Sequence, residues 1–255
     1  RRAFLQVRDL NRTVCVEPPW EAGEDPQWVW QLLSPVYGLG DAPRWWTEDC
    51  RKTMLDAGGK DLPGDRCTWL FGRKKADGTY EVWGWVTYHV DDFKYSASEK
   101  DFDALEKILL KYEMGEAELD NFVFCGVENA TIFDTKGNVE MIEETQKEYI
   151  EQLEEIEVSA ARRMEKDQPA TKEELSSYRG LLGGILWACT VRTDASLETS
   201  LLSSAVAALK VAHLLQINEL LARMKQTSEV GLRYRKLKTD AHVVIGVGGA
   251  NQDLK

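Results

Sequence analysis

The chain carries the run Val82-Trp83-Gly84-Trp85-Val86-Thr87-Tyr88-His89-Val90, which ends in two adjacent carboxylates, Asp91 and Asp92. Apolar and aromatic residues alternate along this run, and that pattern predicts a strand buried on at least one face. The change to Asp-Asp, followed by a second short apolar run, predicts a hairpin tip. Two adjacent acids repel each other, and a hard cation such as Mg²⁺ would relieve that repulsion while keeping open positions for phosphates. An Asx turn in a solvated hairpin explains the same two residues.

The sequence before and around this run predicts strands that follow a proline-rich beginning. Residues 1–50 contain several prolines and lead to a helix near Pro43. Residues 67–96 predict two or three strands, with Ala76-Asp77-Gly78-Thr79 as the turn before the strand that delivers Asp91. The acid pair would therefore close a β-meander.

After the acid pair, apolar spacing predicts a helix over 101–112 and a buried strand over 122–127. The acids between Glu140 and Glu157 have largely helical spacing, which favours a solvated helix face, and a helix is expected through Thr145–Val158. A capping box at Thr171-Lys172-Glu173-Glu174 begins a mainly helical remainder.

Composition sets broad bounds on function. The 255 residues are 43% hydrophobic, so the chain can bury a core. No stretch approaches the ~20 apolar residues of a membrane span, and the first residues lack a signal-peptide core, so we expect an intracellular protein that is not secreted and does not bind membranes. A net charge of −11 weighs against a simple nucleic-acid-binding module. A basic cluster at Arg233, Arg235, Lys236 and Lys238 could still meet a phosphate backbone or only aid solubility.

Several short motifs, at family-like spacings from Ala3 to about Tyr234, resemble the reverse transcriptase region of Ty1/copia-type retrotransposon polyproteins. They are Ala3-Phe4-Leu5, Val14-Cys15-Val16-Glu17-Pro18-Pro19, Val36-Tyr37-Gly38-Leu39, Ala42-Pro43-Arg44 with Trp46, Val90-Asp91-Asp92, Phe124-Cys125-Gly126, Gln146 with Tyr149, Tyr178-Arg179-Gly180-Leu181-Leu182-Gly183 and, loosely, Thr190-Val191-Arg192-Thr193-Asp194. Each motif alone is weak, but their common order makes accidental agreement improbable.

The resemblance implies an α+β fold with a reverse-transcriptase palm and fingers, a thumb and a helical connection. It assigns residues 1–145 to the palm with partial fingers, 146–168 to a thumb-like segment, 169–230 to the connection and 231–255 to the truncated start of a ribonuclease H-like strand. Gln146 and Tyr149 would lead into the thumb, although Tyr149 also suits a plain helix core.

The implied activity is RNA-directed DNA polymerisation by two-metal nucleotidyl transfer, with two Mg²⁺ or Mn²⁺ ions. The partners would be an RNA or DNA template-primer, deoxynucleoside triphosphates and other parts of a Pol polyprotein, in a cytoplasmic particle or the nucleus. Asp91 and Asp92 are the expected catalytic and metal-binding residues. His89 and Val90 would lie at the primer end, where His89 replaces the usual Tyr of Tyr-Val-Asp-Asp.

The resemblance also places Ala3, Phe4, Asp41 and Arg44 at the nucleotide. Phe4 would pack under the incoming sugar, although a core aromatic is an equal interpretation without the fold. Asp41 stands where the family commonly has Gln. It would repel a triphosphate unless a metal or Arg44 compensates, and Arg44 could pair with Asp41 or stabilise the fold.

The chain departs from the family pattern at two places, and the first departure predicts that the chain as given does not polymerise efficiently. The family's first catalytic Asp falls two residues before Arg1, and Asp9 is too far along to replace it. Near the other end, Gly249-Ala250 stands where the ribonuclease H Asp-Ala is expected, so that carboxylate would be lost. A decayed or domesticated nucleic-acid-binding remnant is therefore the alternative. An unrelated phosphotransferase would need a third acid and a nucleotide cradle, and neither is clear in the sequence.

Overall fold

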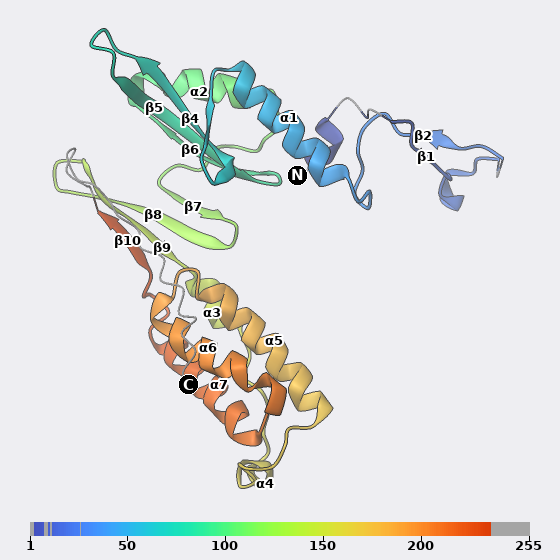
Figure 1. Ribbon diagram of the computed structural model, residues 1–255, viewed down its shortest axis with the longest axis vertical. Coiled ribbons are helices and arrows are strands. Elements are labelled where there is room, and N and C mark those ends of the chain that lie inside the picture. Colours follow the sequence, from blue (N-terminus) through green and yellow to red (C-terminus); the bar gives the residue numbers. More distant parts are fainter. Residues whose placement is uncertain (1–2, 8–9, 11, 26, 236–255) are drawn as a thin grey trace, which may run out of the picture. The chain divides into compact units, whose positions relative to one another are not determined.

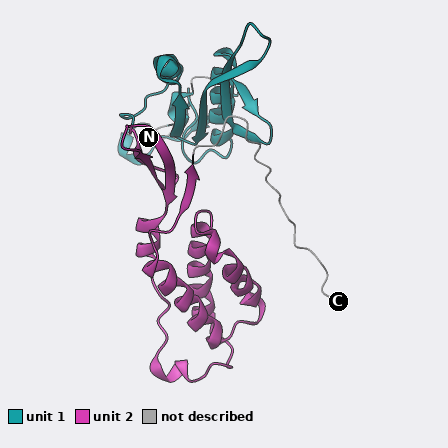
Figure 2. Ribbon diagram, turned by 90° about the vertical axis from the view of Figure 1, so that its left-hand side faces the viewer, with its two compact units in different colours: residues 1–117 teal, residues 118–255 magenta. Residues whose placement is uncertain are grey.

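The chain forms two compact units, residues 1–117 and residues 118–255 (Figure 2). A computed structural model describes residues 3–7, 10, 12–25 and 27–235 (Figure 1). Each unit has a four-stranded antiparallel sheet, helices and its own buried core, so the architecture is α+β. The palm, fingers and thumb assignments stay predictions. The compact units divide after Ala117, within the predicted palm segment 1–145, because residues 121–145 form three strands of one sheet whose fourth strand lies near residue 235.

Unit 1 begins with short elements and continues with a helix, a meander and a second helix. In chain order these are η1 (Ala3–Gln6), β1 (Cys15–Val16), η2 (Trp20–Ala22), β2 (Trp30–Gln31), α1 (Ala42–Asp56), β3 (Lys60–Leu62), β4 (Asp65–Lys74), β5 (Tyr80–His89), β6 (Asp92–Ala97), η3 (Glu99–Asp101) and α2 (Phe102–Leu109). The strand order is β3-β4-β5-β6. The predicted meander is confirmed, with β3 as an additional edge strand.

Helix α1 confirms the helix predicted near Pro43. Pro43 lies in its first turn, where the fixed φ of proline favours the helix and no backbone donor is lost. Its buried residues recur every four positions, which gives one face to the core: Ala42, Trp46, Cys50 and Met54.

The meander folds as its alternation predicts. Along β5, Gly84, Val86 and Tyr88 are buried and their neighbours are more exposed. The turn before β5 contains Gly78 at φ +86°, a conformation that glycine adopts without strain. Helix α2 ends at Leu109, three residues before the predicted end at Tyr112, although Leu105, Leu109 and Tyr112 are all buried as the apolar spacing indicates.

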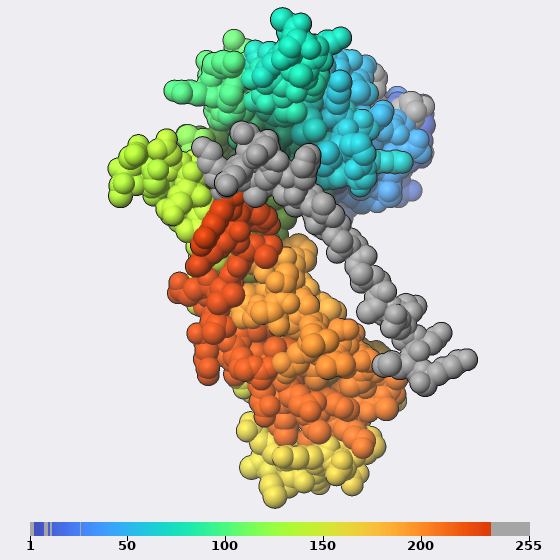
Figure 3. All heavy atoms as spheres, turned by 60° about the vertical axis from the view of Figure 1, so that its left-hand side comes forward, coloured from blue at the N-terminus to red at the C-terminus, as the bar shows by residue number. Residues whose placement is uncertain are grey.

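Unit 2 combines a sheet with a helical bundle. Its elements are β7 (Asn121–Phe124), β8 (Val127–Phe133), β9 (Val139–Thr145), α3 (Lys147–Gln152), α4 (Ala160–Arg163), α5 (Lys172–Ala188), η4 (Thr193–Ala195), α6 (Ser196–Ser204), η5 (Ala205–Ala208), α7 (Val211–Gln226) and β10 (Leu232–Arg235). The strand order is β10-β9-β8-β7. Figure 3 shows the segment around α4, in yellow, at one end of this unit.

The prediction of one continuous strand over residues 122–127 is wrong, because a hairpin turn interrupts the segment. Phe124 pairs with Val127, and the two residues between them, Cys125 and Gly126, have φ of 52° and 74°. Two consecutive positive φ angles are typical of a tight hairpin turn whose twist matches that of the strands. The segment therefore ends β7 and begins β8, and its residues are at most partly buried up to Glu128.

The helix predicted through Thr145–Val158 is too long at both ends. Its beginning belongs to β9, and α3 ends at Gln152, after which Leu153 is extended (φ −66°, ψ 135°). The acids Glu143 and Glu144 consequently lie on a strand, not on a helix face. In β9 these acids have partners on β10, where Arg233 Nε donates to Glu143 Oε1 (2.6 Å) and the Tyr234 hydroxyl to Glu144 Oε2 (3.1 Å).

The helical remainder of unit 2 is confirmed. Thr171 Oγ1 accepts from the Glu174 backbone N–H (3.2 Å), and the Glu174 carboxylate accepts from the Thr171 N–H (2.8 Å), so the predicted capping box begins α5. Helices α5, α6 and α7 share one core, in which the Tyr178 hydroxyl donates to the Leu202 carbonyl (2.8 Å). No helix in the described part of the chain has the length and apolar content needed to cross a bilayer.

Candidate functional site

The acid pair lies at the tip of the β5–β6 hairpin, as predicted. His89 pairs with Asp92 across the hairpin, which leaves Val90 and Asp91 as the two residues of the tip. Val90 has φ +51°, a left-handed conformation that is uncommon for a β-branched residue. His89 and Asp92 are exposed and Asp91 is partly buried. The tip therefore presents two carboxylates and one imidazole within four consecutive residues.

Helix α1 holds this tip through Trp46, whose indole N–H donates to the Val90 carbonyl. The Trp46 side chain is 2% exposed and meets Phe93 and Tyr112 edge-on, at centroid distances of 6.3 and 5.0 Å. Phe93 also stacks on Tyr112 at 5.6 Å. Such pairs add to the stability that burial alone gives, so this aromatic cluster stabilises the β5–β6 hairpin next to its tip. The sequence marks Trp46 only as a motif residue, and the contact with Val90 is not local.

The segment after α2 is hydrogen-bonded to α1 by Lys111 and by Tyr112, which belongs to the same aromatic cluster. The Tyr112 hydroxyl donates to Asp49 Oδ2 (3.0 Å) and lies 2.8 Å from Thr53 Oγ1. Lys111 Nζ donates to the same two groups at 2.8 and 2.6 Å. Burial raises the pKa of Tyr112 well above its usual range, so this hydroxyl remains a donor.

Ala3 and Phe4, predicted at the nucleotide, lie in the core of unit 1. Ala3 is fully buried and Phe4 is 8% exposed in η1, and the Phe4 ring meets Tyr37 at 4.9 Å with an interplanar angle of 54°. Of the two interpretations, the structure places Phe4 as a core aromatic. Contact with a sugar stays a prediction.

Asp41 and Arg44, also predicted at the nucleotide, are not paired with each other. Arg12 holds Asp41 with two hydrogen bonds of 3.0 Å, and Arg44 Nε donates to Glu48 Oε1 (2.8 Å) one helical turn away. Desolvation opposes ionisation of Asp41, but its interactions with Trp45 and Arg12 outweigh that cost and hold the pKa of Asp41 below its usual value. Arg12 belongs to none of the sequence motifs. Its guanidinium compensates the negative charge of Asp41, the role that the sequence predicts for a metal or for Arg44.

The donor set at the tip fits a divalent cation in part. Carboxylate oxygens are the ligands that Mg²⁺ and Mn²⁺ prefer, and Asp91 and Asp92 supply two such groups. Among the described residues no cluster of three His, Cys, Asp or Glu side chains has a geometry that could hold a metal ion. The tip alone thus offers two carboxylates, and a two-ion site would need a further carboxylate.

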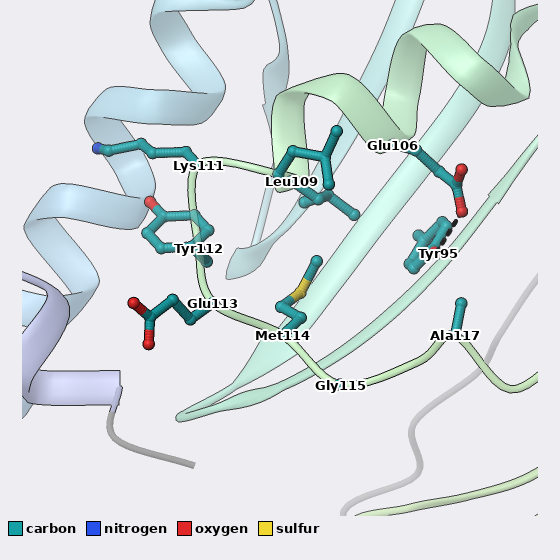
Figure 4. Close-up of a pocket in the computed structure, with 10 residues that line it drawn as sticks. Tyr95, Glu106, Leu109, Lys111, Tyr112, Glu113, Met114, Gly115 and Ala117 are labelled. Carbon is teal, nitrogen blue, oxygen red and sulfur yellow. Dashed lines mark hydrogen bonds between the residues drawn. The ribbon is translucent and has the colours of Figure 1, made fainter.

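A cavity of about 350 Å³ lies in unit 1 beside the aromatic cluster. Figure 4 shows Tyr95 and Glu106 on one side, Tyr112 on the other and Met114 between them. The Tyr95 hydroxyl donates to Glu106 Oε1 (3.2 Å), and burial together with the Glu106 charge raises the pKa of Tyr95. The lining combines apolar side chains with the charged Glu106, Lys111 and Glu113, and no sequence motif indicates this cavity.

In unit 2, the residues predicted to lead into the thumb belong to the core. Gln146 is fully buried, and its amide, oriented to satisfy both partners, donates to the Ala188 carbonyl (3.1 Å) and accepts from Trp187 Nε1 (3.0 Å). Tyr149 packs against the bundle core. The plain-core interpretation of Tyr149 is therefore the one that the structure supports.

Several predicted features lie outside the described residues. They are Asp9, Lys236, Lys238 and Gly249-Ala250. Of the basic cluster, Arg233 is paired with Glu143 in the sheet and Arg235 is exposed.

Comparison with known proteins gives one informative match. The chain is 26% identical over 250 residues to the Saccharomyces cerevisiae protein "Putative transposon Ty5-1 protein YCL074W", and the match covers 91% of this chain and 77% of that protein. This likeness indicates a retrotransposon-related protein. No protein-family model matches the chain, and no solved structure matches it.

Proposed function

We propose that this retrotransposon-related chain is the reverse transcriptase region of a copia-type Pol polyprotein. The observation that carries the proposal is the acid pair Asp91-Asp92 at a hairpin tip that α1 holds through Trp46. The likeness to the Ty5-1 protein extends over nearly the whole chain, which supports a retrotransposon origin for this hairpin. Its partners would be a template-primer, deoxynucleoside triphosphates and other parts of the polyprotein, in a cytoplasmic particle or the nucleus.

In this proposal Asp91 and Asp92 hold Mg²⁺ or Mn²⁺, which would supply Lewis-acid activation of a primer hydroxyl and of the triphosphate. The chain's own residues position that chemistry. The Val90 carbonyl is bound to Trp46, and the tip is therefore fixed relative to the buried face of α1. His89, exposed beside the tip, would contact the primer end.

The decisive experiment measures extension of a labelled oligo(dT) primer on poly(rA) with Mg²⁺ or Mn²⁺. It uses the chain as given and the full reading frame of its locus, each with an Asp91→Asn variant. Asp77→Asn is the matched control, because Asp77 lies in the β4–β5 hairpin turn of the same sheet and asparagine can keep its Asx-type bonds. Extension that is lost in Asp91→Asn and kept in Asp77→Asn supports the proposal. No extension by either protein would contradict it.

A non-catalytic nucleic-acid-binding remnant is the second candidate. The observation in its favour is Asp41, which stands where the family commonly has Gln and is bound by Arg12. A labelled RNA–DNA hybrid that binds in a salt-dependent manner but is not extended, even by the full reading frame, would favour this candidate.

A further inference from the structure

Residues 13–33 form an arm whose composition differs from the rest of unit 1. The arm contains four acids and no Lys or Arg, and it holds three of the nine tryptophans of the chain, Trp20, Trp28 and Trp30. It includes β1, η2 and β2, and Figure 1 shows β1 and β2 projecting beyond α1, away from the β3–β6 sheet. We call this segment the acidic arm.

The tryptophans of the acidic arm face solvent. Trp20 is 87% exposed, Trp28 is 64% exposed and Trp30 is 42% exposed, whereas Trp46 and Trp69 in the same unit are buried. Trp28 and Trp30 are two residues apart, the spacing at which side chains of an extended chain share a face. Exposed indoles gathered in one short segment are unusual for a surface without a partner.

The carboxylates of the acidic arm are available for an incoming charge. Among the described residues, Glu17, Glu21 and Glu24 take part in no ion pair, and Asp25 only accepts from the Gln27 N–H (2.9 Å). Arg12, the basic residue directly before the arm, is bound to Asp41. The arm therefore combines several unneutralised negative charges with three accessible indole rings.

This combination decides which partner fits. A phosphate backbone would be repelled by the carboxylates, and a second copy of the chain would bring the same acidic arm and a net charge of −11. A guanidinium group is attracted by both features, because it stacks on indole faces and forms paired hydrogen bonds with carboxylates. We propose that the acidic arm binds an arginine-rich segment of a partner protein, with the three indoles stacking on guanidinium groups and the glutamates pairing with them.

The test measures anisotropy of a fluorescein-labelled nona-arginine peptide with the full chain at physiological ionic strength. Two double variants remove one feature each, Trp20→Ser with Trp28→Ser, and Glu21→Gln with Glu24→Gln. The control is Glu154→Gln with Glu155→Gln, which changes the net charge equally at two exposed acids of unit 2. Because all these side chains are exposed, the variants should fold normally, and circular dichroism checks this.

We expect each arm variant to bind the peptide about tenfold more weakly and the control to bind it unchanged. A nona-lysine peptide should bind more weakly than nona-arginine, since ammonium lacks the planar face that stacks on indoles. Equal binding by all variants would mean attraction to the overall negative charge, and this would overturn the proposal. So would tryptophan-dependent self-association of the chain, or binding of oligo(dT) in place of the peptide.

Discussion

Arg192 is nearly fully buried in unit 2, and every one of its guanidinium nitrogens has a partner. Nε and Nη2 donate to the two carboxylate oxygens of Asp194 (2.9 and 2.8 Å), and Nη1 donates to the carbonyls of Met224 and Thr227 (3.1 and 3.0 Å). A buried charge is tolerated only when it is paired and hydrogen-bonded in this way. Arg192 thereby joins the end of α7 to the segment between α5 and α6.

We expect Arg192→Leu to lower the free energy of unfolding of unit 2 by about 3 kcal/mol, because two carbonyls at the end of α7 lose their donors. Urea denaturation followed by circular dichroism measures the change. Arg223→Leu is the control, since Arg223 pairs with Glu198 at a mostly exposed position, and its loss should cost at most about 1 kcal/mol. Similar losses in both variants would show that Arg192 contributes no more than a surface ion pair.

Trp46→Phe separates the hydrogen bond to Val90 from the burial of the ring. We expect this variant to lose about 1 kcal/mol of stability in unit 1 and to exchange the amide hydrogens of residues 89–92 faster, because the hairpin tip is no longer held by α1. Hydrogen exchange followed by NMR measures the amides of the hairpin tip and those of the sheet in the same experiment. If the tip amides exchange as before while the sheet amides exchange faster, Trp46 acts through packing alone.

At the scale of elements, local signals predict well where the stabilising contacts are also local. The β5–β6 hairpin, the helix at Pro43 and the capping box at Thr171 form as their sequences indicate. The helix predicted through Thr145–Val158 is too long, because only Lys147–Gln152 is helical. Glu143 and Glu144 share the helical spacing of the acids but lie on β9, which pairs with both β8 and β10. These pairings join residues that are distant in the sequence, so spacing alone does not reveal them.

The extended segment that follows α3 is also stabilised by a residue that is distant in the sequence. Asn218 on α7 accepts from the Ile156 N–H through Oδ1 (2.9 Å) and donates to the Ile156 carbonyl through Nδ2 (2.8 Å). One buried side chain thus satisfies both backbone groups of a residue in an extended segment, as a neighbouring strand would. The same holds for the candidate site. The sequence predicts the acid pair, whereas the contacts Trp46–Val90 and Arg12–Asp41 join residues that are distant in the sequence and were not predictable from it.

We expect Asn218→Leu to destabilise unit 2 by about 2 kcal/mol, because Ile156 would keep a buried N–H and a buried carbonyl without partners. Thermal and urea unfolding measure the loss. Gln216→Leu on the exposed face of the same helix is the control and should change stability by at most about 0.5 kcal/mol. An Asn218→Leu variant as stable as the control would mean that Ile156 finds other partners.

At the scale of the whole molecule, each unit has a core of its own. The buried core of unit 1 lies between Ala3 and Tyr112, and that of unit 2 lies between Ile150 and Met224. The sheet of unit 2 is completed by β10 from the far end of the described chain. No strand is shared between the two sheets in the described residues. These separate cores imply that the units are independent in their folding energetics.

We therefore expect residues 118–235, expressed alone, to fold and to unfold cooperatively with a stability of about 5 kcal/mol or more. Far-ultraviolet circular dichroism during urea titration measures helix content and cooperativity together. Residues 146–235 are the control, because this fragment keeps the bundle but leaves β10 without its partner β9. If residues 118–235 show no cooperative transition, the bundle and its sheet need unit 1 to fold. If residues 146–235 are equally stable, the sheet contributes nothing to the stability of the bundle, and the cooperative folding unit is smaller than residues 118–235.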